Sequence, residues 1–381
     1  MKQLLGLTIT LILFLTFSLG QTNLQNDTSL VFKVNYHLQP FEDTEDYQKL
    51  LNSLNGFLKT KNQSDTSNAY WLQIDFGKYK EPYEDLYHIE TSITFHNLNF
   101  YKPTLLEIVR TSLKDQYVIK LAYIGPDTAG IGTINVIYNI IAVKQPDSYY
   151  KFKSALGVNT ANWHTTTVGT ITFIYKDKLN TEIAEKANQF SMDLAKKFQT
   201  QPISLIYYKC ENPIELFRIK GYDYTKRMYM DTTGGIVGGS NTIFAANNSE
   251  WYPHEIVHFY TRKVFDHPFS RIIDEGYAAY LGGSGGKSLN ELLKITNSFY
   301  KNNHQRDIIN DLNIDYRINR SMSVVYPLGG LICKLAEEKM GFEGIKQLFN
   351  DEDFYKAVEH VLGVNKKNLA DFLKTELDKY K

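Results

Sequence analysis

The sequence predicts an α+β protein in which a β-rich N-terminal part precedes a largely helical C-terminal part. Two observations predict this order. Between residues 30 and 175 the chain holds short segments rich in β-branched and aromatic residues, separated by turn signals. From residue 249 onward the apolar residues recur at helical spacing instead.

The N-terminal part is expected to form a curved or antiparallel sheet. Between residues 30 and 175, strands are predicted at 30–35, 70–76, 91–95, 117–124, 134–144 and 170–175. Helices are predicted at 45–58 and 105–113, where the apolar spacing is helical. This part carries no chemical motif, and its end is expected between residues 163 and 169.

The second part begins with a helix predicted at 181–198 and a strand at 203–208, followed by two glycine pairs within 234–246. Local signals mark two of the later helix ends. Ser288 and Glu291 have the spacing of a capping box. Gly341 lies where a helix C-terminus favours a left-handed residue.

The first twenty residues have the pattern of a secretory signal peptide. Lys2 precedes an apolar run at 4–19, and small residues stand at its exit, Ser18 and Gly20. A membrane anchor is the alternative, because roughly 17 apolar residues can span a bilayer. The run contains several hydroxyl residues, however, and no basic cluster follows it. We therefore expect cleavage near Gly20, no membrane anchor afterwards, and a secreted or periplasmic protein.

Composition excludes some classes of protein. The 381 residues include 42 Lys and Arg, 42 Asp and Glu and 14% aromatic residues, which argues against disorder. The zero net charge, without a long basic run, gives no electrostatic footprint for nucleic acid. Cys210 and Cys333 are the only cysteines. They could form a disulfide in an oxidising compartment or remain buried thiols, and both alternatives stay open.

One stretch of the second part carries a metal-binding motif. Ser249 is a plausible helix N-cap, and Pro253 would then occupy the first turn. His254 and His258 are four residues apart, so they lie on one helix face about one turn apart. Two imidazoles in this arrangement can bind one Zn²⁺, with Glu255 placed as a general base. The competing interpretation is an amphipathic helix with two incidental histidines.

The segment 272–283 argues against that competing interpretation. Glu275 follows His258 at a distance that would place it on the next helix. A catalytic zinc is held by three protein ligands with one open position, and two histidines with one glutamate form such a set. His267 and Asp274 compete with Glu275 as the third ligand.

The chain resembles the gluzincin metallopeptidases, the peptidase MA-like grouping that includes thermolysin-like and M1-like enzymes. The resemblance covers about residues 170–350 and rests on His254-Glu255-x-x-His258, Glu275-Gly276-x-Ala278-x-Tyr280 and Tyr326. It implies that His254, His258 and Glu275 hold one catalytic zinc ion. It also implies that Glu255 is the general base and that Tyr326 stabilises the oxyanion.

The resemblance further implies an edge strand, before the zinc helix, that binds the substrate backbone. Here the segment 238–244 takes that place, and Gly238, Gly239 and Asn241 permit close backbone approach. The substrate would be a peptide or protein. The chain lacks the G-x-M-E-N signature of M1 exopeptidases, which favours an endopeptidase.

These inferences divide the chain into a signal peptide at 1–20, an accessory or propeptide-like domain at 21–165 and a metallopeptidase domain at 166–381. Ala279 occupies the position of the aspartate found in thermolysin-like enzymes, so Asp274 becomes the candidate for orienting a zinc-bound histidine. Two other functions remain open. The metal site could act on a different carbonyl substrate, or a degenerate peptidase fold with a structural zinc could serve as a binding protein.

Overall fold

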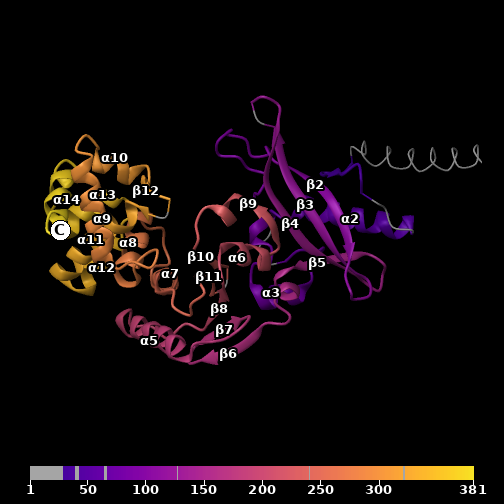
Figure 1. Cartoon of the computed structure of the whole chain (residues 1–381), viewed down its shortest axis with the longest axis horizontal. Helices are drawn as coiled ribbons and strands as arrows, with labels where there is room; N and C mark the ends of the chain where they lie inside the picture. Colours follow the sequence, from indigo (N-terminus) through magenta and orange to yellow (C-terminus); the bar gives the residue numbers. More distant parts are fainter. Residues whose placement is uncertain (1–28, 39–42, 64–66, 127, 240, 321) are drawn as a thin grey trace, which may run out of the picture. The chain divides into compact units, whose positions relative to one another are not determined.

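The computed structural model describes residues 29–38, 43–63, 67–126, 128–239, 241–320 and 322–381, so the predicted signal peptide lies outside it. The chain divides into two compact units (Figure 1): Met1–Ala161 with Phe217–Met228, and Asn162–Leu216 with Tyr229–Lys381. Each unit contains both helices and strands, which confirms the α+β class. The sequence predicted a single division between residues 165 and 166. It did not predict that Phe217–Met228 belongs to the first unit.

The first unit is built on one sheet of order β1-β2-β3-β4-β5, with β9 also paired to β4. Its strands are β1 (Lys33–Val34), β2 (Lys102–Arg110), β3 (Gln116–Pro126), β4 (Gly132–Lys144), β5 (Tyr150–Ser154) and β9 (Tyr222–Thr225). Strands β2 to β5 are antiparallel, as expected. The amphipathic helix α2 (Thr44–Thr60) buries its apolar face. On that face the ring centroid of Phe57 lies 5.0 Å from that of Trp71 and 5.5 Å from that of Phe152.

Three local predictions for this unit are wrong. The segment 105–113 is not helical but lies largely in β2, where it pairs with β3. The segment 70–76 leads into helix α3 (Gln73–Tyr79), and 91–95 forms turns with a single bridge between Ser92 and Asn97. Short apolar runs fit the periodicity of a helix as well as that of a strand, so pairing with other segments decides which of the two forms. The unit also contains η1 (Glu84–Leu86) and α4 (Leu156–Asn159).

The second unit contains a five-stranded sheet of order β10-β11-β8-β7-β6. Its strands are β6 (His164–Val168), β7 (Ile171–Tyr175), β8 (Leu205–Cys210), β10 (Gly235–Gly238) and β11 (Thr242–Ala246). The central β8 is parallel to β7 and β11, whereas β6 and β10 are antiparallel strands at the edges. Parallel strands need a crossover, which α5 (Thr181–Lys197) provides between β7 and β8.

The remainder of the second unit is mainly helical. Its elements are α7 (Pro253–Val264), α8 (Arg271–Gly282), α9 (Leu289–Asn302), α10 (Ile308–Asn313), β12 (Arg317–Asn319), β13 (Met322–Ser323), α11 (Val325–Met340), α12 (Phe342–Phe349), α13 (Phe354–Leu362) and α14 (Leu369–Leu377). Helix α6 (Pro213–Lys220) leads back to the first unit, where η2 (Lys226–Tyr229) begins. The predicted capping box of Ser288 and Glu291 is confirmed, and Gly341 ends α11 with a φ of 62°. Cys210 and Cys333 are buried free thiols.

Helices α8 and α11 pack with their backbones in contact. A Cβ on Gly276 would lie 2.2 Å from the carbonyl carbon of Gly329, and a Cβ on Gly329 would lie 2.2 Å from the carbonyl oxygen of Ile272. Any side chain at either position would push the helices apart. This close approach fixes α8, which carries one of the predicted metal ligands.

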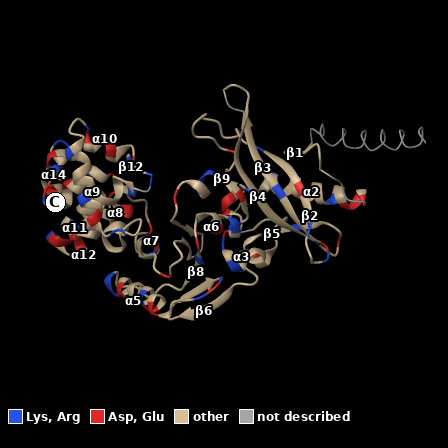
Figure 2. Cartoon of the chain, viewed as in Figure 1, with Lys and Arg blue, Asp and Glu red and all other residues tan. Residues whose placement is uncertain are grey.

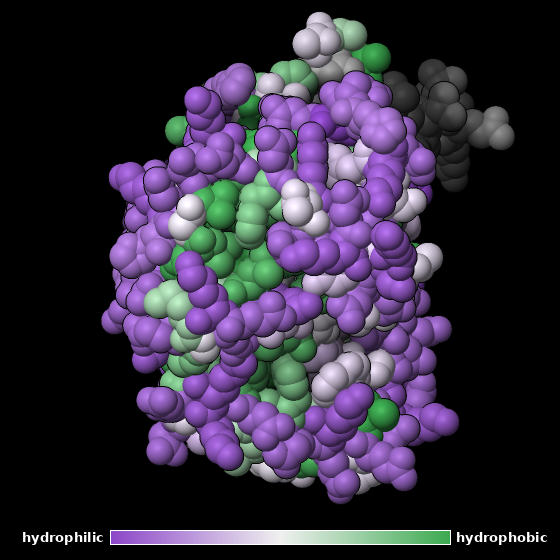
Figure 3. Space-filling view, turned by 90° about the vertical axis from the view of Figure 1, so that its left-hand side faces the viewer, coloured by the Kyte–Doolittle hydropathy of each residue, from purple (hydrophilic) through white to green (hydrophobic). Residues whose placement is uncertain are grey.

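The surface carries charges of both signs. Lys and Arg are interspersed with Asp and Glu over the elements of both units (Figure 2). On the face shown in Figure 3, hydrophilic residues cover most of the surface and hydrophobic residues appear in patches between them. Among the described residues, no helix combines the length and apolar character needed to cross a membrane.

Candidate metal centre

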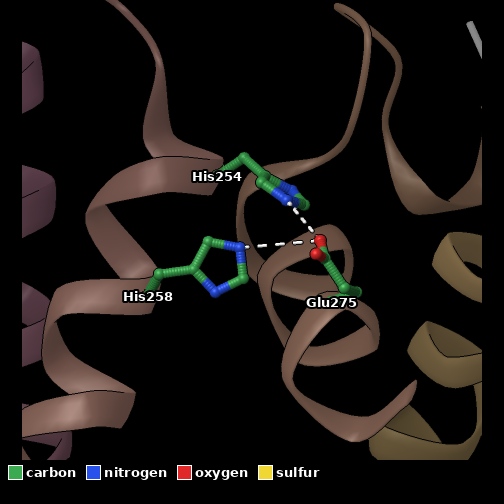
Figure 4. A group of neighbouring side chains, drawn as sticks. All are labelled: His254, His258 and Glu275. Carbon is green, nitrogen blue, oxygen red and sulfur yellow. Dashed lines mark hydrogen bonds and ion pairs between the residues drawn. The ribbon is translucent and has the colours of Figure 1, made fainter. Parts of the chain in front are cut away.

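Helices α7 and α8 bring the three predicted metal ligands together (Figure 4). His254 and His258 are buried on α7, and Glu275 is half-buried on α8. Donor atoms of the three side chains all lie within 4.8 Å of one another. Glu275 Oε2 is 3.2 Å from His254 Nε2 and 3.6 Å from His258 Nε2. The three side chains therefore converge on one point.

The start of α7 places the first histidine. Pro253 occupies the first turn, as predicted, where its missing N–H has no intrahelical partner to lose. Ser249 is not the N-cap, however. Its hydroxyl accepts a hydrogen bond from the backbone N–H of Trp251 at 3.1 Å within the preceding loop, and Tyr252 takes the N-cap position. The helix is held in place by apolar residues such as Ile256, which are fully buried.

An oxygen atom lies close to the Nδ1 atom of each histidine, as a hydrogen-bond partner of His254 and as an ion-pair partner of His258. His254 Nδ1 lies 2.8 Å from the carbonyl oxygen of Gly283, and His258 Nδ1 lies 3.0 Å from Asp274 Oδ2. The Thr261 hydroxyl donates to Asp274 Oδ1 at 2.8 Å. With protons on both Nδ1 atoms, the Nε2 lone pairs would be free to bind a metal ion, which is the tautomer that a metal ligand requires. Asp274 thus occupies the orienting position expected from the sequence.

The electrostatics of the cluster favour a positive charge. Burial alone lowers the pKa of His258, but its contacts with Asp274 and Glu275 outweigh burial and raise the pKa to about 10. Burial alone raises the pKa of Glu275, but hydrogen bonds from His254 and His258 hold it well below its ordinary range. Both directions have the same cause, because the imidazoles and the Glu275 carboxylate stabilise each other's charged forms.

This donor set fits a zinc ion. Zinc prefers imidazole nitrogen and carboxylate oxygen, and bonds of about 2.1 Å in a tetrahedral site put ligand atoms about 3.4 Å apart. The distances of 3.2 Å and 3.6 Å from Glu275 Oε2 to the two Nε2 atoms agree with that spacing. Three donors also leave one coordination position for water or substrate.

Of the two predicted catalytic residues, Glu255 lies on α7, which carries two residues of the cluster, and Tyr326 lies on α11. Glu255 follows His254 on α7 and is half-buried, and within the described part of the chain no hydrogen bond or ion pair engages its carboxylate. Tyr326 is the second residue of α11, and its ring meets the His254 ring edge-on with centroids 5.7 Å apart. Burial raises the pKa of Tyr326 to about 12, so its hydroxyl remains a proton donor at neutral pH.

The predicted substrate strand is only partly as expected. Gly238 ends the edge strand β10, while Gly239 and Asn241 lie in the turn that follows, where Asn241 has a φ of 50°. The prediction that 238–244 forms an edge strand is wrong from residue 242 onward, because β11 pairs with β10 on one side and with β8 on the other. The edge strand is β10, and the Tyr252 ring lies against its Gly235.

Two residues near the cluster, Arg271 and Tyr252, were not identified as site residues from the sequence. Arg271 Nε is 3.8 Å from Glu275 Oε1, a spacing of four helical residues that could have indicated the pair. Burial raises the pKa of Tyr252, and the negative charge of Glu255 raises it further. Of the competing third ligands, His267 is exposed and its Nδ1 lies 3.1 Å from the Pro268 carbonyl oxygen, outside the three-residue cluster.

No protein-family model and no curated protein sequence matches this chain. We therefore infer its function from the residues of the site.

Proposed function

We propose that the protein is a secreted zinc-dependent metallopeptidase that hydrolyses peptide bonds. The supporting observation is the convergence of His254 Nε2, His258 Nε2 and Glu275 Oε2 within 4.8 Å, with Glu255 beside them on α7. A structural zinc site is usually closed by four protein ligands and needs no base. Three donors next to a half-buried glutamate fit a catalytic site better.

Each residue of the site has a defined task in this proposal. A zinc ion held by the three ligands would activate water and polarise the carbonyl group of the peptide bond. Glu255 accepts a proton from the attacking water and later delivers it to the leaving amine. Tyr326 donates a hydrogen bond to the oxyanion that develops on the carbonyl oxygen. Asp274 and the Gly283 carbonyl keep the two imidazoles oriented.

The decisive experiment compares the wild type with Glu255→Gln and measures bound zinc together with cleavage of casein and a broad peptide library. We expect one zinc ion in both proteins and a loss of activity of about 10²- to 10⁴-fold in the variant. Glu185→Gln, an exposed change on α5 with the same loss of charge, serves as the control and should retain full activity. Removal of the metal with a chelator should abolish activity reversibly.

The other functions give different results in the same experiment. A degenerate fold with a structural zinc would hold the metal but cleave no peptide in either protein. A hydrolase of another carbonyl substrate would cleave no peptide, yet would lose activity on small esters or amides when Glu255 is changed. Absence of bound zinc in the wild type would contradict all three.

The export of the protein is part of the proposal. It rests on the apolar run 4–19 with its basic flank and small-residue exit. N-terminal sequencing of the protein recovered outside the cytoplasm should find a start near Gln21. Recovery of an intact N-terminus from the cytoplasm would contradict export.

A further inference from the structure

The segment that carries Tyr326 is joined to the metal-ligand helix by a series of polar contacts. Asp315, between α10 and β12, is at their centre. Its Oδ2 accepts a hydrogen bond from Arg271 Nη1 at 3.0 Å, and its Oδ1 accepts one from the Ser323 hydroxyl. The Ser323 oxygen accepts a hydrogen bond from the backbone N–H of Val325 at 3.0 Å. Val325 is the first residue of α11, and Tyr326 is the next.

The other end of this series reaches Glu275. Arg271 Nε lies 3.8 Å from Glu275 Oε1, the carboxylate oxygen that does not face the two histidines. The guanidinium group of Arg271 therefore stands between two carboxylates, one on the metal ligand and one on Asp315. Asp315 therefore links Arg271 on α8 to Ser323, whose oxygen accepts the hydrogen bond from the first residue of α11.

These contacts are suited to orientation rather than to stability. The side chains of Arg271 and Asp315 are 58% and 35% exposed, and ion pairs that are this accessible contribute little to folding. Ser323, in contrast, is buried, and its hydroxyl has both a defined acceptor and a defined donor. Asp315 also has a left-handed φ of 54°, which aspartate and asparagine tolerate better than most residues.

We propose that Asp315 is a positioning residue, which fixes the first turn of α11 and with it the Tyr326 hydroxyl relative to Glu275. This rests on the proposed function, in which Tyr326 is the oxyanion donor. All the residues involved belong to the second unit. A small displacement of a catalytic group can cost up to about 100-fold in rate, so a modest shift of α11 would be measurable.

The test is a double-mutant cycle between Asp315→Asn and Tyr326→Phe, assayed as kcat and KM for a peptide substrate. Asparagine keeps the left-handed backbone and an acceptor for Ser323 but loses the charge that binds Arg271. We expect Asp315→Asn to lower kcat about tenfold with little change in KM. In the Tyr326→Phe background the same change should cost less than about twofold, because its effect passes through the tyrosine. Equal losses in both backgrounds would overturn the proposal.

A second measurement does not depend on activity. 3-Fluorotyrosine incorporated at position 326 gives a ¹⁹F resonance that reports the surroundings of the ring. We expect this resonance to shift in Asp315→Asn and in Ser323→Ala, while zinc affinity stays within about twofold of the wild type. Asp266→Asn removes the same negative charge at an exposed position and should leave the resonance unmoved. An unmoved resonance in both test variants would overturn the positioning role. If the wild type cleaves no peptide, the proposed function fails and the resonance alone decides the role of Asp315.

Discussion

His258 and Asp274 face each other from helices α7 and α8, with the imidazole Nδ1 3.0 Å from the carboxylate Oδ2. Asp274 is buried, and its other oxygen accepts a hydrogen bond from the Thr261 hydroxyl at 2.8 Å. Asp274 directly precedes Glu275 on α8. The helix that offers the proposed third ligand therefore also contacts the proposed second ligand, so the proposed metal centre depends on how α8 is packed.

Loss of the Asp274 carboxylate should weaken metal binding. We expect Asp274→Ala to lower zinc affinity about 10- to 100-fold, because the imidazole of His258 loses the group that fixes its orientation and raises its basicity. Competition with a chelator on the purified protein measures this. Thr261→Val should shift affinity in the same direction by less. Asp266→Ala, at an exposed position, should have no effect, and an unchanged affinity in Asp274→Ala would contradict the role given to that residue.

A second prediction concerns the carbonyl group that orients His254. Gly283 has a φ of 73°, and a Cβ there would lie 2.3 Å from the carbonyl oxygen of Lys287. Gly283→Ala must therefore move the loop and the carbonyl, and we expect zinc affinity to fall about tenfold. Stability should fall by about 1–3 kcal/mol from backbone strain.

The matched control for this change is Gly286→Ala in the same loop. Gly286 also has a positive φ, of 75°, but a Cβ there would meet nothing within 4 Å. The control should lose about 1–2 kcal/mol of stability from the left-handed backbone and retain its zinc affinity. Equal loss of affinity in both variants would show that the His254–Gly283 contact has no special role. Denaturant unfolding and chelator competition provide the two measurements.

The ligand cluster was predictable because its signal is local. A spacing of four residues places His254 and His258 on one face of any helix, and a glutamate at the start of the next helix is close to them when the helices pack. The partners of the Nδ1 atoms could not be derived in this way. Gly283 lies beside His254 only because of the path of the loop that follows α8, and the contact of Asp274 with His258 depends on how α7 and α8 cross.

The errors in the fold have a similar origin. Strands β3 and β4 were predicted because their runs of β-branched residues are long, whereas the residues of β2 have apolar spacing that also suits a helix. Pairing with β3 decides that case. The return of β9 to the first sheet depends on its pairing with β4, a contact distant in sequence that no local pattern indicates.

The contact between α8 and α11 gives a third prediction. Gly276→Ala would place a methyl group on the backbone of Gly329, and overpacking of this kind usually costs about 1–3 kcal/mol. Because Gly276 follows Glu275, we also expect weaker zinc binding. Gly77→Ala is the control, since Gly77 is a helical glycine in α3 with nothing near its Cβ position. The control should be neutral or slightly stabilising. Unfolding curves that rank the two variants in the opposite order would contradict the close packing.

The last prediction concerns Lys61, a buried cation in the first unit. Its Nζ lies 3.0 Å from Glu90 Oε2 and donates to the Leu86 carbonyl oxygen at 2.6 Å. Burial lowers the pKa of Lys61 from its ordinary value of 10.5, and Glu90 offsets this only in part. In the pH range just below 10.5 the unfolded chain therefore binds more protons at this group than the folded chain does. The contribution of Lys61 to stability must then increase as the pH rises toward 10.5.

Lys61→Met tests this sign. At pH 7 the variant should be less stable by about 3 kcal/mol, because Glu90 and the Leu86 carbonyl lose their common partner. The difference between wild type and variant should widen between pH 8 and pH 10, since only the wild type retains the titrating group. Denaturant midpoints across that range measure it, with Lys114→Met as an exposed control that should show no such trend. A difference that narrows with rising pH would mean that the ion pair with Glu90 outweighs burial and raises the pKa of Lys61 instead.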